Sequence, residues 1–314
     1  MRRAKITVIG GGTGLSVLLK GLKHFPVDIS AIVTVADDGG SSGRLREELD
    51  IPPPGDIRNV LVALSEVEPL VEELFQHRFE NGTGLSGHSL GNLLLAGMSS
   101  VMGDFSRGVK EVSRVLNVKG RVIPASNHHL TLHAEYKDGS YGKGESMIPR
   151  AGKPIKRVFL EPEDCEAMPE ALEAIKEADL VILGPGSLYT SVIPNLLVPG
   201  IGDALKQTAA NRVYICNVMT QPGETDGYCV SDHISAINEH AQYRLVDAVI
   251  MNTQTIPLSY KERYEHEGAK PVTPDAAKLR DMNIDLIEDE LLLFSNEVLR
   301  HDAKKLSERL LTLL

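Results

Sequence analysis

Four glycines within five residues, Gly10, Gly11, Gly12 and Gly14, constrain the possible folds of this chain more than any other feature. They follow a short apolar run rich in β-branched residues at 6–9, which is typical of a strand buried in a parallel sheet. Leucines then return at helical spacing from residue 15 to residue 22. A strand, a glycine turn and a helix in this order direct the first N–H groups of the helix toward any ligand above the carboxyl end of the strand.

This turn favours phosphate, because unpaired N–H donors and the positive end of the helix dipole coincide there. The dinucleotide fingerprint also requires a glycine at its sixth position, where this chain has Leu15. The glycines could alternatively serve only a tight turn and close packing of the helix on the sheet. Their place at the first strand-to-helix turn favours an anion site, and we assign ligand contacts to Gly11, Gly12, Thr13 and Gly14.

Charge and composition exclude several classes of protein. The 314 residues carry a formal net charge of −10, which argues against a general nucleic-acid binder because phosphate backbones demand a positive surface. Glycines and prolines interrupt the uncharged stretch 180–202, so we expect no membrane insertion. The three cysteines lack metal-ligand spacing, and no signal-peptide pattern precedes the glycines. We therefore expect a cytoplasmic protein without an assigned metal, and we expect it to form a homo-oligomer.

A second strand is predicted at 29–35, and two aspartates, Asp37 and Asp38, follow it. Acidic residues at this position hold a ribose hydroxyl in doubly wound dinucleotide sites. The next residues are expected to form a flexible polar loop, in which Ser41, Ser42 and Arg44 could hold phosphate through hydroxyl and guanidinium donors. A solvated turn would explain the serines but not two adjacent aspartates, so we favour a functional role.

Residues 56–117 are predicted to be mostly helical, as an excursion from the alternation of strands and helices. Three prolines at 52–54 break the chain, and Asp56 is expected to cap the helix that follows. A glycine-rich segment at 82–92 interrupts the helical pattern and could place His88 and Asn92 near the ligand. For the histidine we weigh a structural role equally.

Short strands are predicted between 120 and 159, where apolar side chains alternate with His129, His133 and Glu135. We interpret these three as ordinary sheet residues, because the tight ligand cluster of a zinc site is missing. After residue 169 strands and helices alternate again, and loops of small or polar residues follow the strands. The sequence therefore predicts a Rossmann-like, three-layer, doubly wound α/β fold with a mainly parallel sheet and a helical insertion, in one domain spanning 1–314.

Five motifs of the chain resemble the bacterial gluconeogenesis factor family (YvcK type). They are Ile-Gly-Gly-Gly-Thr-Gly at 9–14, Ala-Asp-Asp-Gly-Gly-Ser-Ser-Gly-Arg-Leu-Arg at 36–46, Pro-Pro-Gly-Asp-Ile-Arg-Asn at 53–59, Gly-His-Ser-Leu-Gly-Asn at 87–92 and the segment 184–201 that begins Gly-Pro-Gly-Ser. The resemblance covers nearly the full length. It implies a cytoplasmic protein that cells need for normal shape and envelope synthesis on gluconeogenic carbon sources, and it implies binding of the nucleotide sugar UDP-N-acetylglucosamine.

The motifs supply further candidate ligand-binding residues, which are Asp56, Asn59, His88, Asn92, Gly184, Gly186, Ser187 and Asn195. Two more candidates lie late in the chain. Tyr264 lies in a charged segment without an obvious core role, so it could stack on the base or sugar. Arg300 follows two apolar residues and could pair with phosphate, although both residues could also be ordinary surface positions.

The chain is also similar to the 2-phospholactate transferases (CofD type) of the same superfamily, which share the glycine turn, the acidic pair and the Gly-Pro loop. It departs from them at 186–189 and 39–43, where their flavin-like acceptor would lie. Two functions therefore stand: a regulatory factor that binds a nucleotide sugar without turnover, and a phosphoryl-group transferase that uses Mg²⁺ held by Asp37 or Asp38. The missing fingerprint glycine disfavours an NAD(P)-dependent oxidoreductase. No nucleophile–base pair can be recognised, which favours the binding factor.

Overall fold

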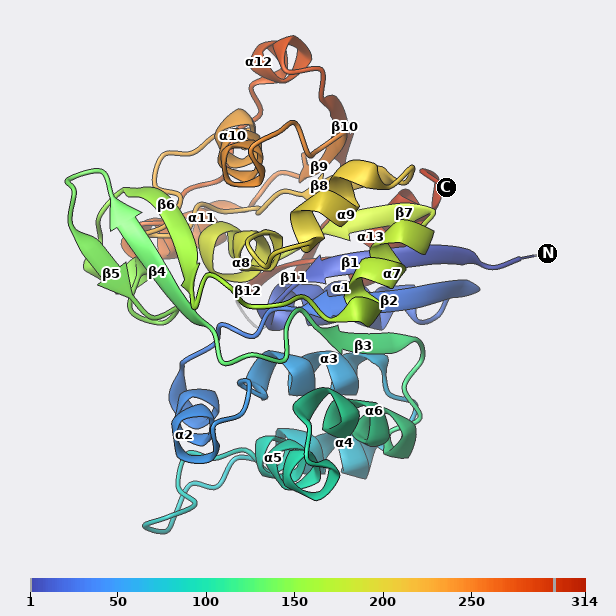
Figure 1. The fold of residues 1–314 in the computed structure, drawn as a ribbon. Coiled ribbons are helices and arrows are strands. Elements are labelled where there is room, and N and C mark those ends of the chain that lie inside the picture. Colours follow the sequence, from blue (N-terminus) through green and yellow to red (C-terminus); the bar gives the residue numbers. More distant parts are fainter. Residues whose placement is uncertain (1, 296–297) are drawn as a thin grey trace.

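A seven-stranded parallel sheet is the centre of the computed structural model, which describes residues 2–295 and 298–314 (Figure 1). The chain starts in the middle of the sheet, adds strands on one side, and then returns to add strands on the other. This reversal beside β1 is the topological switch point of a doubly wound sheet, and it confirms the predicted fold class. The strand order is β10 (Asp285–Asp289), β9 (Ala248–Asn252), β8 (Asn211–Ile215), β7 (Leu180–Leu183), β1 (Ala4–Gly10), β2 (Val27–Val33) and β3 (Arg121–Pro124).

Helices cover both faces of the sheet because side chains alternate along each strand. On β1, Ile6 and Val8 pack in one cluster with α1 (Gly12–Leu22), α3 (Gly55–Leu64) and α13 (Ala303–Leu311). Ile9 belongs to the cluster on the opposite face. That face is covered by α7 (Pro169–Glu177), α8 (Ile193–Leu196), α9 (Ile201–Gln207), α10 (Val230–Ala241) and α12 (Ala276–Asp281).

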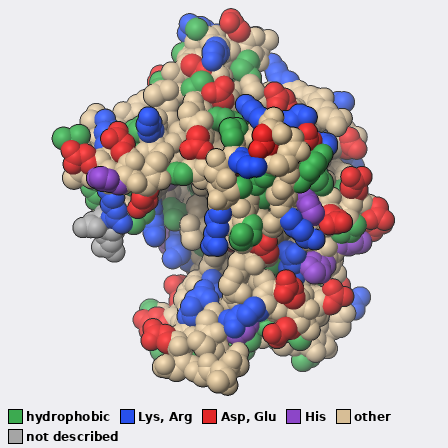
Figure 2. Space-filling view, turned by 90° about the vertical axis from the view of Figure 1, so that its left-hand side faces the viewer, with side chains coloured by type: hydrophobic (Ala, Val, Ile, Leu, Met, Phe, Trp, Pro, Cys, Tyr) green, Lys and Arg blue, Asp and Glu red, His purple; other side chains and the backbone are tan. Residues whose placement is uncertain are grey.

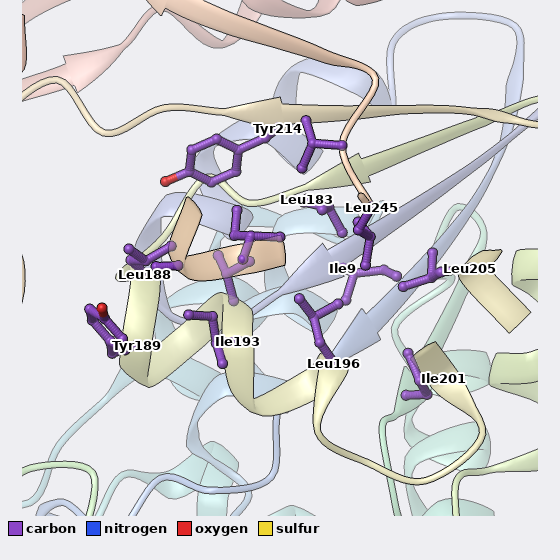
Figure 3. Close-up of a cluster of buried hydrophobic side chains, with 14 of the residues drawn as sticks. Ile9, Leu183, Leu188, Tyr189, Ile193, Leu196, Ile201, Leu205, Tyr214 and Leu245 are labelled. Atoms are coloured by element: carbon purple, nitrogen blue, oxygen red, sulfur yellow. The ribbon is translucent and has the colours of Figure 1, made fainter. Parts of the chain in front are cut away.

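The opposite cluster also explains how the chain leaves β7. Figure 3 shows Leu188, Tyr189 and Ile193 packed below Tyr214 of β8. The segment after Ser187 therefore turns at once into a π-helical turn at Leu188–Val192, which leads into α8. The sequence predicts a loop at this point. The segment is helical instead, because its side chains are buried.

The helical excursion lies between β2 and β3, as the sequence predicts. It consists of α3, α4 (Pro69–Gln76), α5 (Leu90–Met102) and α6 (Phe105–Val115). One expectation before it is wrong: the polar loop predicted from residue 39 is instead the helix α2 (Gly40–Leu49). Ser41, Ser42 and Leu45 share its buried side, and two of these three are polar, which hides the helical period in the sequence. No helix in the described ranges is long and apolar enough to cross a membrane.

A three-stranded antiparallel arm projects beside the carboxyl ends of the parallel strands (Figure 1). It consists of β4 (Thr131–Tyr136), β5 (Tyr141–Lys143) and β6 (Ile155–Glu161), with a 3₁₀ turn at Pro149–Ala151. The predicted alternation is confirmed, because Leu132 and Ala134 are buried whereas His133 and Glu135 are half-buried on the other side. Near the same edge lie α11 (Leu258–His266) and a hairpin of β11 (Leu292–Ser295) and β12 (Val298–His301).

Gly21 provides a test of the packing between α1 and α13. A Cβ there would press on the carbonyl of Ala303 and lie 2.6 Å from Ser307 Oγ. We expect Gly21→Ala to lower the free energy of unfolding by about 1–3 kcal/mol in urea denaturation, because neither helix can retreat without opening the core. Gly202→Ala in α9 is the matched control, because its Cβ would only reach ordinary contact, 3.7 Å from a carbonyl oxygen. Equal stability of the two variants would contradict this account.

Candidate functional site

The glycine turn joins β1 to α1 at the carboxyl edge of the sheet. Gly12 has a φ of +67°, a backbone conformation that residues with a side chain rarely adopt. A Cβ on Gly11 would collide with Thr34 and would lie 2.6 Å from the Asp56 carboxylate. A Cβ on Gly14 would lie 2.9 Å from the Pro185 carbonyl oxygen. Three neighbouring segments therefore pack directly on the backbone of this turn, which only glycine permits.

A cavity of about 610 Å³ lies over the turn. Figure 2 faces this edge of the sheet and shows a recess between the upper and lower parts of the molecule, with lysine and arginine side chains among those around it. The cavity brings together seven of the residues that the sequence nominates from four separate segments: Gly11, Thr13, Gly14, Gly186, Ser187, Tyr264 and Arg300. The first helix turn, the loop after β7, α11 and β12 thus meet in one place.

Tyr264 and Arg300 lie on the side of the cavity formed by the late elements. Tyr264 is half-buried, and its hydroxyl accepts a hydrogen bond from the Leu299 N–H at 3.2 Å. It also packs against a small apolar cluster, so the expectation that it has no core role is wrong. Arg300 is exposed, and in residues 2–295 and 298–314 no carboxylate forms an ion pair with it. Its positive charge is therefore available to an anion.

Several polar residues of the cavity are absent from the sequence prediction, and they include Asn217, Gln221 and His301. Asn217 donates its side-chain N–H to the Gly186 carbonyl at 3.0 Å, and Gln221 donates to the Ser187 hydroxyl at 2.6 Å. These bonds hold the loop after β7. The sequence could have indicated Asn217 and Gln221, because both follow the strand β8. Nothing in the sequence marks His301.

The residues after β2 form a separate, buried polar network. Ser41 Oγ lies 3.0 Å from His88 Nδ1 and accepts a hydrogen bond from the Asn92 amide at 3.1 Å. Arg58 donates to the Asn92 carbonyl oxygen at 3.1 Å and to Asn59 at 2.8 Å. Burial lowers the pKa of His88, so its ring is neutral. This network ties α2, α3 and α5 together.

None of the network residues lines the cavity over the glycine turn. Ser41 and Ser42 are buried, and Arg44 donates to the Ser86 carbonyl at 2.8 Å. The structure therefore separates the predicted phosphate contacts of 41–44 from those of the turn. Asn195 is buried as well, and it donates to the carbonyls of Gly10 and Ser191 from beneath. Gly184 continues the ladder of backbone hydrogen bonds between the strands β7 and β1.

Acidic side chains lie between the glycine turn and this network. Asp56 does not cap α3, since Pro54 occupies that position; the Asp56 carboxylate instead accepts the Gly12 N–H. Burial, followed by the charge of Asp37, raises the pKa of Asp56 to about 7. Burial, followed by the charge of Asp37, also raises the pKa of Glu145 to about 8. Asp38 accepts the N–H of Ser146 at 2.9 Å, which attaches the arm to this edge.

The transferase alternative would hold Mg²⁺ through Asp37 or Asp38. Carboxylate oxygens are the ligands that Mg²⁺ prefers. Across residues 2–295 and 298–314, however, no three histidine, cysteine or acidic side chains converge in a way that could hold an ion. Mg²⁺ is commonly held by one or two carboxylates together with substrate phosphates, so the transferase alternative stays a prediction.

A second cavity of about 700 Å³ lies at the opposite, amino edge of the sheet. Its basic side chains are already engaged, because Lys5 pairs with Glu177 at 2.7 Å and Arg121 lies 3.7 Å from Glu173. None of the residues that line it belongs to the first turn of a helix. The cavity over the glycine turn is therefore the better candidate.

The chain is similar to known proteins over nearly its whole length. The family model described as 2-phospho-L-lactate transferase CofD matches residues 6–292. The chain is 62% identical to a gluconeogenesis factor of Halalkalibacterium halodurans, over 99% of this chain and 97% of that one. It is 58% identical to the gluconeogenesis factor of Bacillus subtilis, over 100% and 99%. An X-ray structure of a Bacillus halodurans protein superimposes with a TM-score of 0.97 at 62% identity, covering 99% of this chain and 100% of that one.

The buried carboxyl of Asp56 predicts a dependence of stability on pH. Its pKa rises from 3.8 to about 7 on folding, so its contribution is full at low pH and is lost as the pH rises through about 7. Asp56→Asn keeps an acceptor for the Gly12 N–H but does not titrate. We expect urea denaturation between pH 4 and pH 7 to show a shallower fall for this variant, by up to about 1.4 kcal/mol per pH unit.

Glu163→Gln serves as the control, because this carboxylate is exposed and should leave the parent's pH dependence intact. A slope for Asp56→Asn equal to that of the parent would mean that the Asp56 carboxyl is ionised and solvated in the folded protein.

Proposed function

The chain belongs to the CofD family and within it to the gluconeogenesis factors, and from this premise we propose that it binds the nucleotide sugar UDP-N-acetylglucosamine over its glycine turn. We propose further that it is a cytoplasmic regulatory factor that acts without turnover and supports cell shape and envelope synthesis on gluconeogenic carbon sources. One observation carries this proposal: a single cavity is lined by the turn, by Tyr264 and by Arg300.

The diphosphate would lie over the turn. Thr13 and Gly14 belong to the first turn of α1, whose N–H groups have no partner within the helix. The positive end of the helix dipole adds to this attraction. Arg300 supplies the full charge that the turn lacks, and a charge-assisted hydrogen bond contributes about 1.5–3 kcal/mol.

The base or sugar would lie against the late elements. The ring of Tyr264 offers a flat surface, and the neighbouring cavity wall includes Val218, Met219 and Leu299. Such a wall suits the face of a planar or ring-shaped group better than it suits water. A nucleotide sugar combines an anionic centre with two ring-shaped ends, which is the combination that this cavity offers.

Binding without turnover is supported by the hydrogen bonds of the polar lining. The hydroxyl of Ser187 is engaged by the Gln221 amide rather than by a base. The carboxyl of Glu224, at the cavity's border, is bonded to the N–H of Tyr189 and the hydroxyl of Thr190. These groups position loops, and a nucleophile needs an adjacent base to be activated.

Phosphoryl-group transfer is the second candidate, favoured by the description of the matching family model. It predicts turnover of a phosphate donor that requires Mg²⁺ and disappears in Asp37→Asn and Asp38→Asn. On our proposal these substitutions change ligand affinity equally with and without Mg²⁺. Metal-dependent turnover by the parent protein would overturn the non-enzymatic function.

The proposal predicts a strong dependence of affinity on Arg300. In titration calorimetry with UDP-N-acetylglucosamine, Arg300→Ala should weaken binding about ten- to a hundred-fold, because one charge-assisted bond is lost. Lys304→Ala is the matched control: it removes a basic side chain that is 80% exposed, a few residues along the chain and outside the cavity. Absence of binding by the parent would reject the nucleotide-sugar proposal.

A second pair of variants separates the ring of Tyr264 from its hydroxyl. Tyr264→Ala should weaken binding more than Tyr264→Phe if the ring stacks on the ligand. Tyr264→Phe also leaves the Leu299 N–H without its acceptor, so the melting temperature of each variant must be recorded first. Unchanged affinity in both Arg300→Ala and Tyr264→Ala would move the ligand away from β12 and α11.

A further inference from the structure

Two residues that line the cavity each carry a buried polar atom without a hydrogen-bond partner in the described part of the chain. The atoms are Gln221 Oε1 and His301 Nε2. Buried polar groups are nearly always paired, because an unpaired one has lost water and gained nothing. Gln221 and His301 are 80 positions apart in the sequence, yet both reach the same cavity. Both atoms are closed off from solvent in the ligand-free protein, so a ligand in the cavity would pair with them once the two side chains turn toward it.

Gln221 is held in place for such a role. Its backbone N–H donates to the Thr225 hydroxyl at 2.9 Å, and its side-chain amide donates to the Ser187 hydroxyl at 2.6 Å. A hydroxyl can donate or accept, so the amide could equally be placed the other way round. In either orientation one end of the amide is satisfied by Ser187 and the other end remains for a ligand.

His301 is held on the inner side of the late hairpin. It pairs with Leu292, which is buried, whereas Arg300 pairs with the exposed Leu293. Neighbouring residues of a strand point to opposite sides, so Arg300 lies at the rim and His301 lies deeper. Burial lowers the pKa of His301 to about 4, and the neutral ring therefore has one donor and one acceptor nitrogen near pH 7.

The chemistry of this pair indicates what it recognises. Both groups are uncharged, so unlike Arg300 they add no positive charge toward a phosphate. Together they offer hydrogen bonds of both kinds beside an apolar wall that includes Val218 and Met219. The complementary ligand group is uncharged and flat and carries a donor next to an acceptor. An amide or imide, with an N–H beside a C=O, has these properties.

We propose that Gln221 and His301 recognise an amide-type group of the ligand and thereby determine which nucleotide sugars bind. This inference rests on the proposed function and adds the specificity of the same cavity. UDP-N-acetylglucosamine carries the required chemistry twice, in the acetamido group of its sugar and in the imide edge of its uracil. A site that leaves polar groups unpaired without the correct ligand discriminates strongly against analogues that lack the matching group.

Titration calorimetry of the parent, Gln221→Met and His301→Phe with four ligands distinguishes the two sources. UDP-N-acetylglucosamine against UDP-glucose reports the acetamido group, and UDP against CDP reports the imide. If the pair reads the acetamido group, each variant binds UDP-N-acetylglucosamine about ten-fold more weakly and UDP-glucose unchanged. If it reads the imide, each variant weakens all three uridine ligands alike and loses the preference for UDP over CDP.

Stability of the ligand-free protein gives an independent readout. Gln221→Met also loses the hydrogen bond to Ser187 and should melt lower, so this readout applies to His301→Phe. Because that substitution removes an unpaired buried polar atom and keeps most of the side-chain volume, its melting temperature should stay equal or rise. A merely structural role would lower it. His233→Phe is the matched control, since His233 Nε2 is also buried and unpaired, in the described residues, but does not line the cavity. This variant should bind every ligand as the parent does.

Two results would overturn the inference without touching the proposed function. One is parent-like affinity of Gln221→Met and His301→Phe for all four ligands. The other is an equal loss for all four, CDP included, which would make the pair a support for the loop at Ser187. A parent that binds no uridine ligand would reject the proposed function itself, and the inference with it.

Discussion

The close approach of the Gly11 backbone to Thr34 and Asp56 is the contact on which the carboxyl edge of this protein depends. Thr34 follows β2 and Asp56 belongs to α3, so the turn after β1 is pressed between two neighbouring elements. Pro185 closes the turn from the side of β7, and Asn195 holds it from beneath through the Gly10 carbonyl. The N–H groups at the start of α1 are therefore fixed before any ligand arrives, which lowers the entropy cost of binding.

The charges around this turn are arranged in two layers. Below it lie buried carboxyls, of which Asp56 accepts a hydrogen bond from the turn itself. Above it lies the cavity, with Arg300 on a hairpin that comes from the far end of the sequence. An ionised Asp56 would repel an anion over the turn. Burial, which favours the protonated carboxyl of Asp56, and the positive charge of Arg300 would therefore both favour an anion there. The anion preference that we propose for the site would thus be a property of several elements rather than of the glycine turn alone.

This arrangement also bears on the choice between binding and transfer. The residues after β2 are tied into α2, α3 and α5 by Ser41, His88, Asn92 and Arg58, and their hydrogen-bonding capacity is largely used. The loop after β7 is tied to β8 through Asn217 and Gln221. Polar residues that hold loops in place are suited to a rigid binding site, which supports a regulatory factor on a fold shared with transferases.

The sequence alone determined the features that depend on short-range periodicity. They are the strand, glycine turn and helix at 4–22, the parallel order around them, the helical excursion and the alternating faces of β4. It also nominated Tyr264 and Arg300, which the structure places at one cavity with the glycine turn. Tertiary structure alone decided that residues 40–49 form a helix, that Asp56 is buried beneath the turn, and that Ser41–Arg44 lie apart from the cavity. It also decided that Gln221 and His301, each with one unpaired buried polar atom, line the same cavity. Burial and pairing arise from contacts between residues far apart in the chain, which no local pattern encodes.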